Sequence, residues 1–269
     1  MSHYALLTDR ALIDVAGPDW RGFLQGLLTQ DVETLADGEI RFGALLTPQG
    51  RLLYDLFLIG TSEGCLVDCV AEHREALIAR LSLYRLRAKV TIAPLDLPVA
   101  ALWDSDAPPP GWLADPRLPA LGLRGYGLAP PIGADAGDYD VHRLSLGVPG
   151  LADWGSDRTY PIEANFDLLN GIDFKKGCFV GQETTSRMKR RGQIKTRMAP
   201  VTYEGSALAP GSELLAGELR AGETHSSGAG VAIASLRLDR LEAGDRRLPD
   251  GREWRSQLPA WMTGAVQTV

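Results

Sequence analysis

A single cysteine in a segment of lysines and glycines is the feature of this sequence best suited to chemistry. The segment reads Lys175-Lys176-Gly177-Cys178-Phe179-Val180-Gly181-Gln182-Glu183. Cations beside a cysteine, and a helix that begins just after it, favour the thiolate, which is the form that attacks an electrophile or binds a metal. Gly177 and Gly181 permit a tight turn and the close approach of another molecule. The pattern predicts a functional thiol at Cys178; the alternative is a small buried hydrophobe at a turn.

Positive charge is concentrated around this cysteine. Residues 175–197 carry eight basic side chains against Glu183 alone, a net charge of +7, whereas the whole chain has −6 and the remainder therefore −13. Residues 184–191 have the composition of a short basic helix, with Gly192 placed as its C-terminal cap. A local basic segment on an acidic body favours a specific anionic partner, such as a carboxylate tail, a phosphate or an RNA backbone. The alternative is a solvated helix face that binds nothing.

The elements expected to position this segment are mixed helices and hairpin strands. Apolar residues at helical spacing predict a helix that opens near Pro18 and a second one that carries Leu77, Leu81 and Tyr84 on one side. Strands are predicted at residues 41–46, 51–59, 65–70 and 89–93, and the turn Thr47-Pro48-Gln49-Gly50 joins the first two as a hairpin. This order predicts an α+β domain instead of alternating βαβ units.

Two domains are predicted along the chain. Residues 94–138 are rich in proline and glycine, which predicts a loop-rich surface junction between subdomains. From residue 198 the pattern changes to short β-prone runs at 198–203, 212–215 and 230–238, separated by glycine-rich turns. We therefore expect an α+β body over residues 1–197 and a small C-terminal β-barrel over residues 198–269.

Several classes of protein are disfavoured by what the 269 residues contain. Cys65 and Cys69 lie on one predicted strand without a neighbouring His or Cys, which favours core packing, and the four histidines are scattered; no metal site is assigned. Three cysteines are fewer than the four thiolates that usually hold an iron-sulfur cluster, so a cluster would be held transiently or shared with a partner. No apolar run reaches the roughly 18 to 20 residues of a membrane span, and no leader is recognisable. We expect a cytoplasmic protein with reduced thiols.

The octad K-G-C-F-V-G-Q-E, residues 176–183, resembles the signature of the YgfZ family of folate-binding proteins. Other blocks resemble that family in the same order: residues 23–31, 50–51, 84–90, 161–165 and 191–195. The resemblance implies a fold like the glycine-cleavage T-protein, with a folate-binding body of two intertwined subdomains and a C-terminal β-barrel. It also implies that the protein binds tetrahydrofolate and supports the assembly or repair of iron-sulfur clusters in client enzymes, including tRNA-modifying ones.

The resemblance also suggests site residues. Cys178 is the signature thiol, Lys176 is grouped with it as catalytic, and the remaining signature positions are expected to bind the cofactor: Gly177, Gly181, Gln182 and Glu183. Tyr139 falls where relatives have an aromatic residue lining the folate pocket. Arg10 falls where another aromatic residue occurs, and an arginine could instead stack on a ring or pair with a glutamate carboxylate. Glu163 and Asn165 offer donors and acceptors for a pterin, and the alternative is that both are buried groups bonded to backbone.

The predicted function is thus that of a tetrahydrofolate-binding accessory factor whose partners are folate and iron-sulfur client or assembly proteins. One alternative is a folate-dependent aminomethyltransferase-type enzyme, and whether the chain is an enzyme stays open. A second alternative is an RNA-binding or scaffold protein that uses the basic helix and whose binding is strongly salt-dependent. Membrane attachment and direct nucleic-acid binding are not expected.

Overall fold

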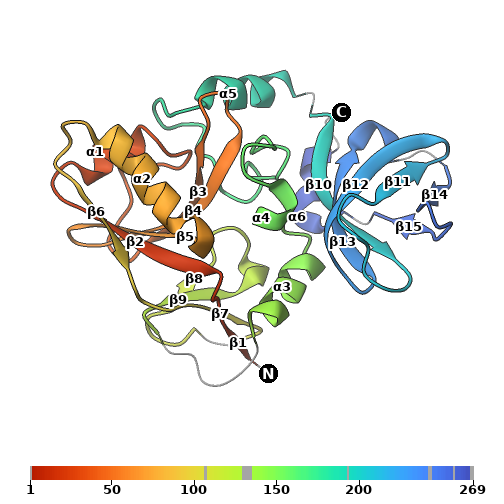
Figure 1. The fold of residues 1–269 in the computed structure, drawn as a ribbon, viewed down its shortest axis with the longest axis horizontal. Helices are drawn as coiled ribbons and strands as arrows, with labels where there is room; N and C mark the ends of the chain where they lie inside the picture. Colours follow the sequence, from red (N-terminus) through yellow and green to blue (C-terminus); the bar gives the residue numbers. More distant parts are fainter. Residues whose placement is uncertain are drawn as a thin grey trace. The chain divides into compact units, whose positions relative to one another are not determined.

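The computed structural model describes residues 2–105, 108–128, 135–192, 194–241, 244–256 and 258–266 (Figure 1). The chain forms two compact units. The first comprises Met1–Tyr139 and Leu169–Gln182, and the second comprises Asp140–Leu168 and Glu183–Val269. The chain thus leaves the first unit, returns to it for fourteen residues that include Cys178, and leaves again. The predicted domains, residues 1–197 and 198–269, stay a prediction. The two compact units have different boundaries, and compactness alone does not define a domain.

A five-stranded sheet with two helices beside it forms the core of the first unit (Figure 1). The strands, in sheet order, are β3 (Ile40–Leu46), β4 (Leu52–Gly60), β5 (Gly64–Val70), β2 (Arg10–Ala16) and β6 (Thr91–Leu95). The two helices are α1 (Trp20–Gln25) and α2 (Arg74–Arg85), and a 3-10 turn, η1 (Ala71–His73), comes directly before α2. Leu24 of α1 and Leu77 and Leu81 of α2 are buried against Ile13 and Val15 of β2, as the helical spacing of apolar residues requires.

The predicted hairpin is confirmed. Strands β3 and β4 pair antiparallel from Ile40 opposite Ile59 to Leu46 opposite Leu52. The backbone N–H of Gly50 donates to the carbonyl of Thr47 at 2.8 Å, and Gly50 has φ +87°, a conformation that favours glycine. The hairpin matters for the site because its turn packs against the segment that follows Cys178.

The second sheet of the first unit lies partly in the region predicted to be loop. Its order is β1 (His3–Leu6), β7 (Val99–Trp103), β9 (Leu123–Tyr126) and β8 (Leu113–Ala114), with a 3-10 turn η2 (Pro119–Leu121). The predicted surface position is wrong for β7, all five residues of which are buried. The run Val-Ala-Ala-Leu-Trp is continuously apolar, as in a strand covered on both faces, and the many prolines around it obscured this signal.

The second unit contains a six-stranded antiparallel sheet. Its order is β14 (Arg246–Arg247), β11 (Glu213–Ala216), β12 (Leu219–Gly228), β13 (Val231–Arg237), β10 (Thr196–Tyr203) and β15 (Trp254–Arg255). A bridge between Arg247 and Glu253 joins its two ends, so the sheet nearly closes. The three predicted strands are confirmed as β10, β11 and β13. Strand β12 was missed because its sequence, Leu-Arg-Ala-Gly-Glu-Thr-His-Ser-Ser-Gly, lacks the β-branched and aromatic residues of a typical strand.

Helices complete the described chain. Helix α3 (Ala136–Ser145) crosses from the first unit into the second, and α4 (Leu151–Trp154), α5 (Gln182–Arg191), the 3-10 turn η3 (Leu238–Arg240) and α6 (Ala260–Val266) follow. In the described ranges, none of these helices is both long and apolar enough to cross a membrane. Helix α5 confirms the predicted basic helix, and Gly192 after it has φ +66°, as expected for a C-terminal cap.

Candidate functional site

The segment that carries Cys178 is first fixed to the loop after α1 by backbone and side-chain hydrogen bonds. The hydroxyl of Thr29 donates to the carbonyl of Gly171 at 2.7 Å, and the N–H of Asp173 donates to the carbonyl of Thr29 at 3.0 Å. The Gln30 amide also donates to the carbonyl of Asn170 at 2.7 Å. Because Thr29 is fully buried, the start of the segment is part of the interior of the first unit.

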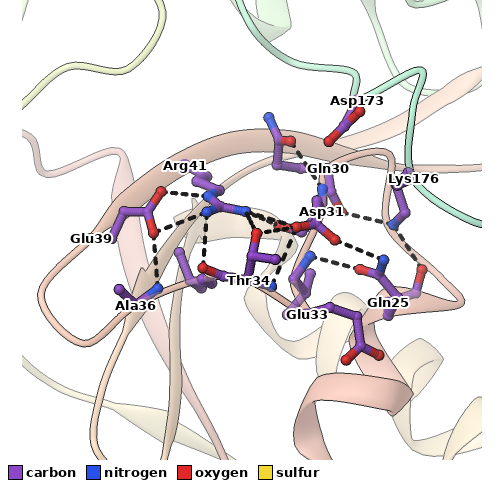
Figure 2. Close-up of polar contacts among 12 residues, drawn as sticks. Gln25, Gln30, Asp31, Glu33, Thr34, Ala36, Glu39, Arg41, Asp173 and Lys176 are labelled. Carbon is purple, nitrogen blue, oxygen red and sulfur yellow. Dashed lines mark hydrogen bonds and ion pairs between the residues drawn. The ribbon is translucent and has the colours of Figure 1, made fainter.

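Lys176 provides the second attachment (Figure 2). Its Nζ donates to the carbonyl oxygens of Gln25 and Gln30, each at 2.8 Å. It also donates to the carbonyl oxygen of Leu28 at 2.7 Å. An ammonium group has three protons, so all of its donors are used. Burial lowers the pKa of Lys176 to about 8, an effect that nearby Asp31 opposes. Lys176 therefore fastens the segment to the loop 25–30 through neutral acceptors.

The loop that accepts these bonds is held by its own polar network (Figure 2). The Asp31 carboxylate accepts hydrogen bonds from the Gln25 amide at 2.8 Å, from Arg41 at 3.1 Å, and from the Thr34 hydroxyl. Burial acts to raise the pKa of Asp31, but the hydrogen bonds from Thr34, Gln25 and Arg41 outweigh it and lower this pKa to about 2. Arg41 also binds both oxygens of Glu39. The three carbonyls that meet Lys176 are thus presented by a preformed loop.

A third attachment follows the cysteine. Phe179 is buried and Val180 packs on the core of the first unit. Gly181 has φ +80°, and a Cβ there would lie 2.6 Å from the carbonyl oxygen of Thr47 and 2.9 Å from the Cα of Gly50. Glycine is required here, because a side chain would meet both the strained backbone and the hairpin turn.

Between these attachments, Gly177 and Cys178 are exposed, and no atom lies within 4 Å of where a Gly177 Cβ would be. Cys178 is a free thiol on the surface, whereas Cys65 and Cys69 are buried and burial raises the pKa of each to about 12. The predicted core role of Cys65 and Cys69 is confirmed. The geometry is that of a thiol held out on a loop that is fixed on both sides.

Residues after the loop present positive charge. Gln182 begins α5, its N–H donating to the carbonyl of Phe179 at 3.2 Å, and Glu183 is exposed. Four side chains on α5 are exposed cations: Arg187, Lys189, Arg190 and Arg191. Lys189 lies 3.8 Å from the buried carboxylate of Asp167.

The two cofactor candidates that lie elsewhere in the first unit are both buried and hydrogen-bonded within it. The Tyr139 hydroxyl accepts a hydrogen bond from Arg117 at 3.2 Å. Arg10 donates to Asp68 at 2.7 Å and to Asp55 at 2.9 Å. A role for either residue in binding a cofactor stays a prediction, and Arg10 already has two carboxylate partners.

Glu163 and Asn165 belong to the second unit. Asn165 is fully buried with φ +62°, donates to the carbonyl of Met198 at 2.7 Å and accepts from Arg197 at 3.0 Å. Glu163 accepts from the N–H of Tyr160 at 3.1 Å. These contacts match the alternative of polar groups bonded within the protein, and the predicted pterin contacts remain untested.

Sequence reasoning missed a buried charged cluster between the two sheets of the first unit. Arg124 and the Tyr126 hydroxyl donate to the second oxygen of Asp68 at 2.7 and 3.0 Å, and Arg117 binds both oxygens of Asp115 at 3.0 and 2.8 Å. The guanidinium of Arg124 lies 3.8 Å from the centre of the Phe57 ring. Burial acts to raise the pKa of Asp68, but Arg10 and Arg124 outweigh it and lower this pKa. The sequence signal that could have revealed this cluster is Asp68 itself, a charged residue inside the otherwise apolar strand Cys-Leu-Val-Asp-Cys-Val.

No group of three or more His, Cys, Asp or Glu side chains suited to a metal ion occurs in the described residues.

Comparison with solved structures gives the fold. The chain superposes on the glycine cleavage system aminomethyltransferase T from Bartonella henselae with a TM-score of 0.77 and 19% identity, covering 97% of this chain and 86% of that one. At this identity the likeness shows the fold alone. It confirms the predicted T-protein-like fold, and residues 195–264 match the CAF17 C-terminal β-barrel domain, which confirms the barrel.

Comparison with curated proteins gives the family. The human iron-sulfur cluster assembly factor IBA57, mitochondrial, is 34% identical over 263 residues, which cover 81% of this chain and 74% of that protein. The IBA57 homologue of Mycosarcoma maydis is 32% identical and covers 74% of this chain. The chain spans little more than half the length of that fungal relative, 57%. These relatives are mitochondrial proteins, so the expectation of a cytoplasmic protein is wrong. The chain belongs to the family of iron-sulfur cluster assembly factors represented by IBA57.

Proposed function

We propose that this protein supports the assembly of iron-sulfur clusters and that Cys178 is the thiolate through which it holds cluster iron. The observation that carries the proposal is the exposed position of Cys178 on a loop fixed by Lys176 before it and by Gly181 after it. Iron is a suitable partner for a cysteine sulfur, because the thiol loses its proton when the sulfur–iron bond forms and the resulting thiolate is the ligand.

One thiolate is too few for a cluster, since clusters are usually held by four. The remaining ligands must therefore come from a partner, such as an assembly protein or the client enzyme. An exposed cysteine can be reached by such a partner, whereas Cys65 and Cys69 are buried. Client enzymes that modify tRNA are the class we propose, in line with the resemblance of the octad at residues 176–183.

The test is complementation of a strain that lacks the endogenous protein, with activities of four-iron enzymes and the level of an iron-sulfur-dependent tRNA modification as readouts. Cys178→Ala should lose both, while its amount in cells and its melting temperature stay at wild-type values. Lys175→Ala, which removes an exposed neighbouring cation, is the matched control and should complement. Full complementation by Cys178→Ala would refute the role of the thiolate.

Tetrahydrofolate is the small ligand that we propose, supported by the T-protein-like fold and by the exposed cations of α5, which suit the carboxylates of a folate tail. The polar groups of Arg10, Glu163 and Asn165 already have partners in the protein, so we assign pterin recognition to none of them and derive no chemical step through folate. Calorimetric titration with tetrahydrofolate tests this, with Arg190→Glu expected to weaken saturable binding and Cys178→Ala expected to leave it unchanged. Absence of binding by the wild type would remove folate from the proposal and leave the thiolate role standing.

A further inference from the structure

The C-terminal end of α2 exposes two leucines that the core does not use. Leu77 and Leu81 fill the buried face of the helix, whereas Leu83 and Leu86 are 78% and 89% exposed. Leu86 follows the last helical residue and has φ +44° and ψ −104°, outside the regions that a residue with a Cβ ordinarily adopts. A large apolar side chain is thus held in water on a strained backbone, which is unfavourable unless something covers it.

Leu86 lines two grooves. One groove, of about 590 Å³, is lined by Phe23, Leu27 and Tyr84 together with Leu86 itself. The other, of about 400 Å³, lies on the side of residues 16–18 and 87–91. Shallow grooves that combine apolar and charged side chains, beside a projecting leucine, are suited to receiving the side chains of another protein. An apolar surface that enters a lipid bilayer projects outward instead.

Three cations surround these grooves: Arg85, Arg87 and Lys89 are all exposed. Within the described ranges none of their side chains has a hydrogen bond or ion pair. At the other end of the same helix, Arg74 is paired with Asp96 at 2.7 Å. The segment itself is fixed, because the N–H of Lys89 donates to the Asp19 carboxylate at 2.7 Å. Unpaired positive charge on a chain of net charge −6 complements an acidic partner.

We propose that this surface, formed by Phe23, Leu27, Leu83, residues 84–87 and Lys89, docks an acidic protein segment that carries apolar side chains. The leucines and grooves take the apolar side chains, and the three cations take the carboxylates. RNA fits the charge but not the two leucines, which offer its phosphates and bases no hydrogen bond. The proposal does not depend on Cys178 or on folate.

The probe is a synthetic fluorescent helical peptide with leucines at i, i+3 and i+7 and glutamates at the flanking positions, measured by anisotropy with the full-length protein. We expect the wild type to bind the peptide saturably and Arg87→Glu to bind it roughly tenfold more weakly. Arg190→Glu, which reverses an exposed cation on the basic helix α5, is the matched control and should bind normally. A peptide with lysine in place of glutamate should not bind.

Leu86→Gly separates docking from folding. Glycine accepts the positive φ of this position, so the variant should melt at or above the wild-type temperature and yet lose binding roughly tenfold. No saturable peptide binding, equal binding by Leu86→Gly, or equal loss in Arg190→Glu would each overturn the proposal. A different occupant would also overturn it. That outcome would be a wild-type protein that does not bind the peptide but binds anionic vesicles, RNA or a second copy of itself, with that binding lost in Leu86→Gly.

Discussion

Lys176 and the Arg10–Asp68 cluster are two ways of burying a cation in the same unit, and they differ in their acceptors. Lys176 gives its three protons to neutral carbonyls of one loop. Arg10 and Arg124 instead share the carboxylate of Asp68, and the cluster joins the two sheets of the unit. Carboxylates neutralise the buried guanidinium groups, whereas carbonyls only solvate an ammonium. The first arrangement fastens a loop that displays a thiol, and the second is part of the fold.

The largest expected effect comes from removing the shared carboxylate. Asp68→Ala removes the carboxylate shared by the buried guanidinium groups of Arg10 and Arg124 and by the Tyr126 hydroxyl, and leaves Asp55 as the remaining carboxylate partner of Arg10. The free energy of unfolding should therefore fall by about 3–5 kcal/mol. Asp96→Ala removes an exposed ion pair with Arg74 and should cost at most about 1 kcal/mol. Urea denaturation measures both. Equal losses of unfolding free energy in the two variants would mean that the buried cluster stabilises the protein no more than an exposed ion pair does.

The attachment after the thiol should be nearly as sensitive, because it is built from backbone. Gly181→Ala forces a Cβ to within 2.6 Å of the Thr47 carbonyl at a positive φ, and should destabilise the first unit by about 1–3 kcal/mol. Gly177→Ala, on the other side of Cys178, meets open space and should change stability by less than about 0.5 kcal/mol. Thermal melting of the pair is the measurement, and a harmless Gly181→Ala would show that the hairpin turn can move away.

Lys176→Met tests whether the ammonium fastens the loop. Three carbonyls lose their donor, but they can rehydrate because Lys176 is only half-buried, so the loss in unfolding free energy should be about 1–2 kcal/mol. The sharper readout is local: amide hydrogen exchange should rise in residues 175–181 and leave β4 and β5 protected. Lys175→Met, at an exposed position, is the control. Unchanged exchange in Lys176→Met would assign the fixing of the loop to Thr29 and Gly181 alone.

Local signals explain what the sequence could predict. The hairpin at residues 41–59 follows from two apolar runs joined by a Pro-Gln-Gly turn, and α5 follows from its composition and Gly192. The glycines beside Cys178 predicted a tight turn that another molecule can approach, but a buried cysteine was the alternative, and local sequence does not decide between them. The attachment of Lys176 was not predictable, since its acceptors are backbone carbonyls some 146 to 151 positions away and any residue type supplies a carbonyl. Strand β7 likewise depends on pairing with β1 and β9, and the partners of Asp68 come from β2 and β9, which are distant in the sequence.

The smallest expected effect on stability lies at the thiol that the loop displays. Cys178→Ser changes an exposed atom and should leave the unfolding free energy within about 0.5 kcal/mol of wild type. Iodoacetamide should modify one cysteine in the native wild type, none in native Cys178→Ser, and three in urea-unfolded wild type, because Cys65 and Cys69 are buried with their pKa values raised to about 12. Mass spectrometry counts the adducts. If Lys176→Met alters the rate at which iodoacetamide modifies Cys178 while Lys175→Met does not, the Lys176 ammonium governs how the thiol is presented. Lys176 would then act on the functional thiol, whereas the Asp68 cluster acts on the stability of the fold.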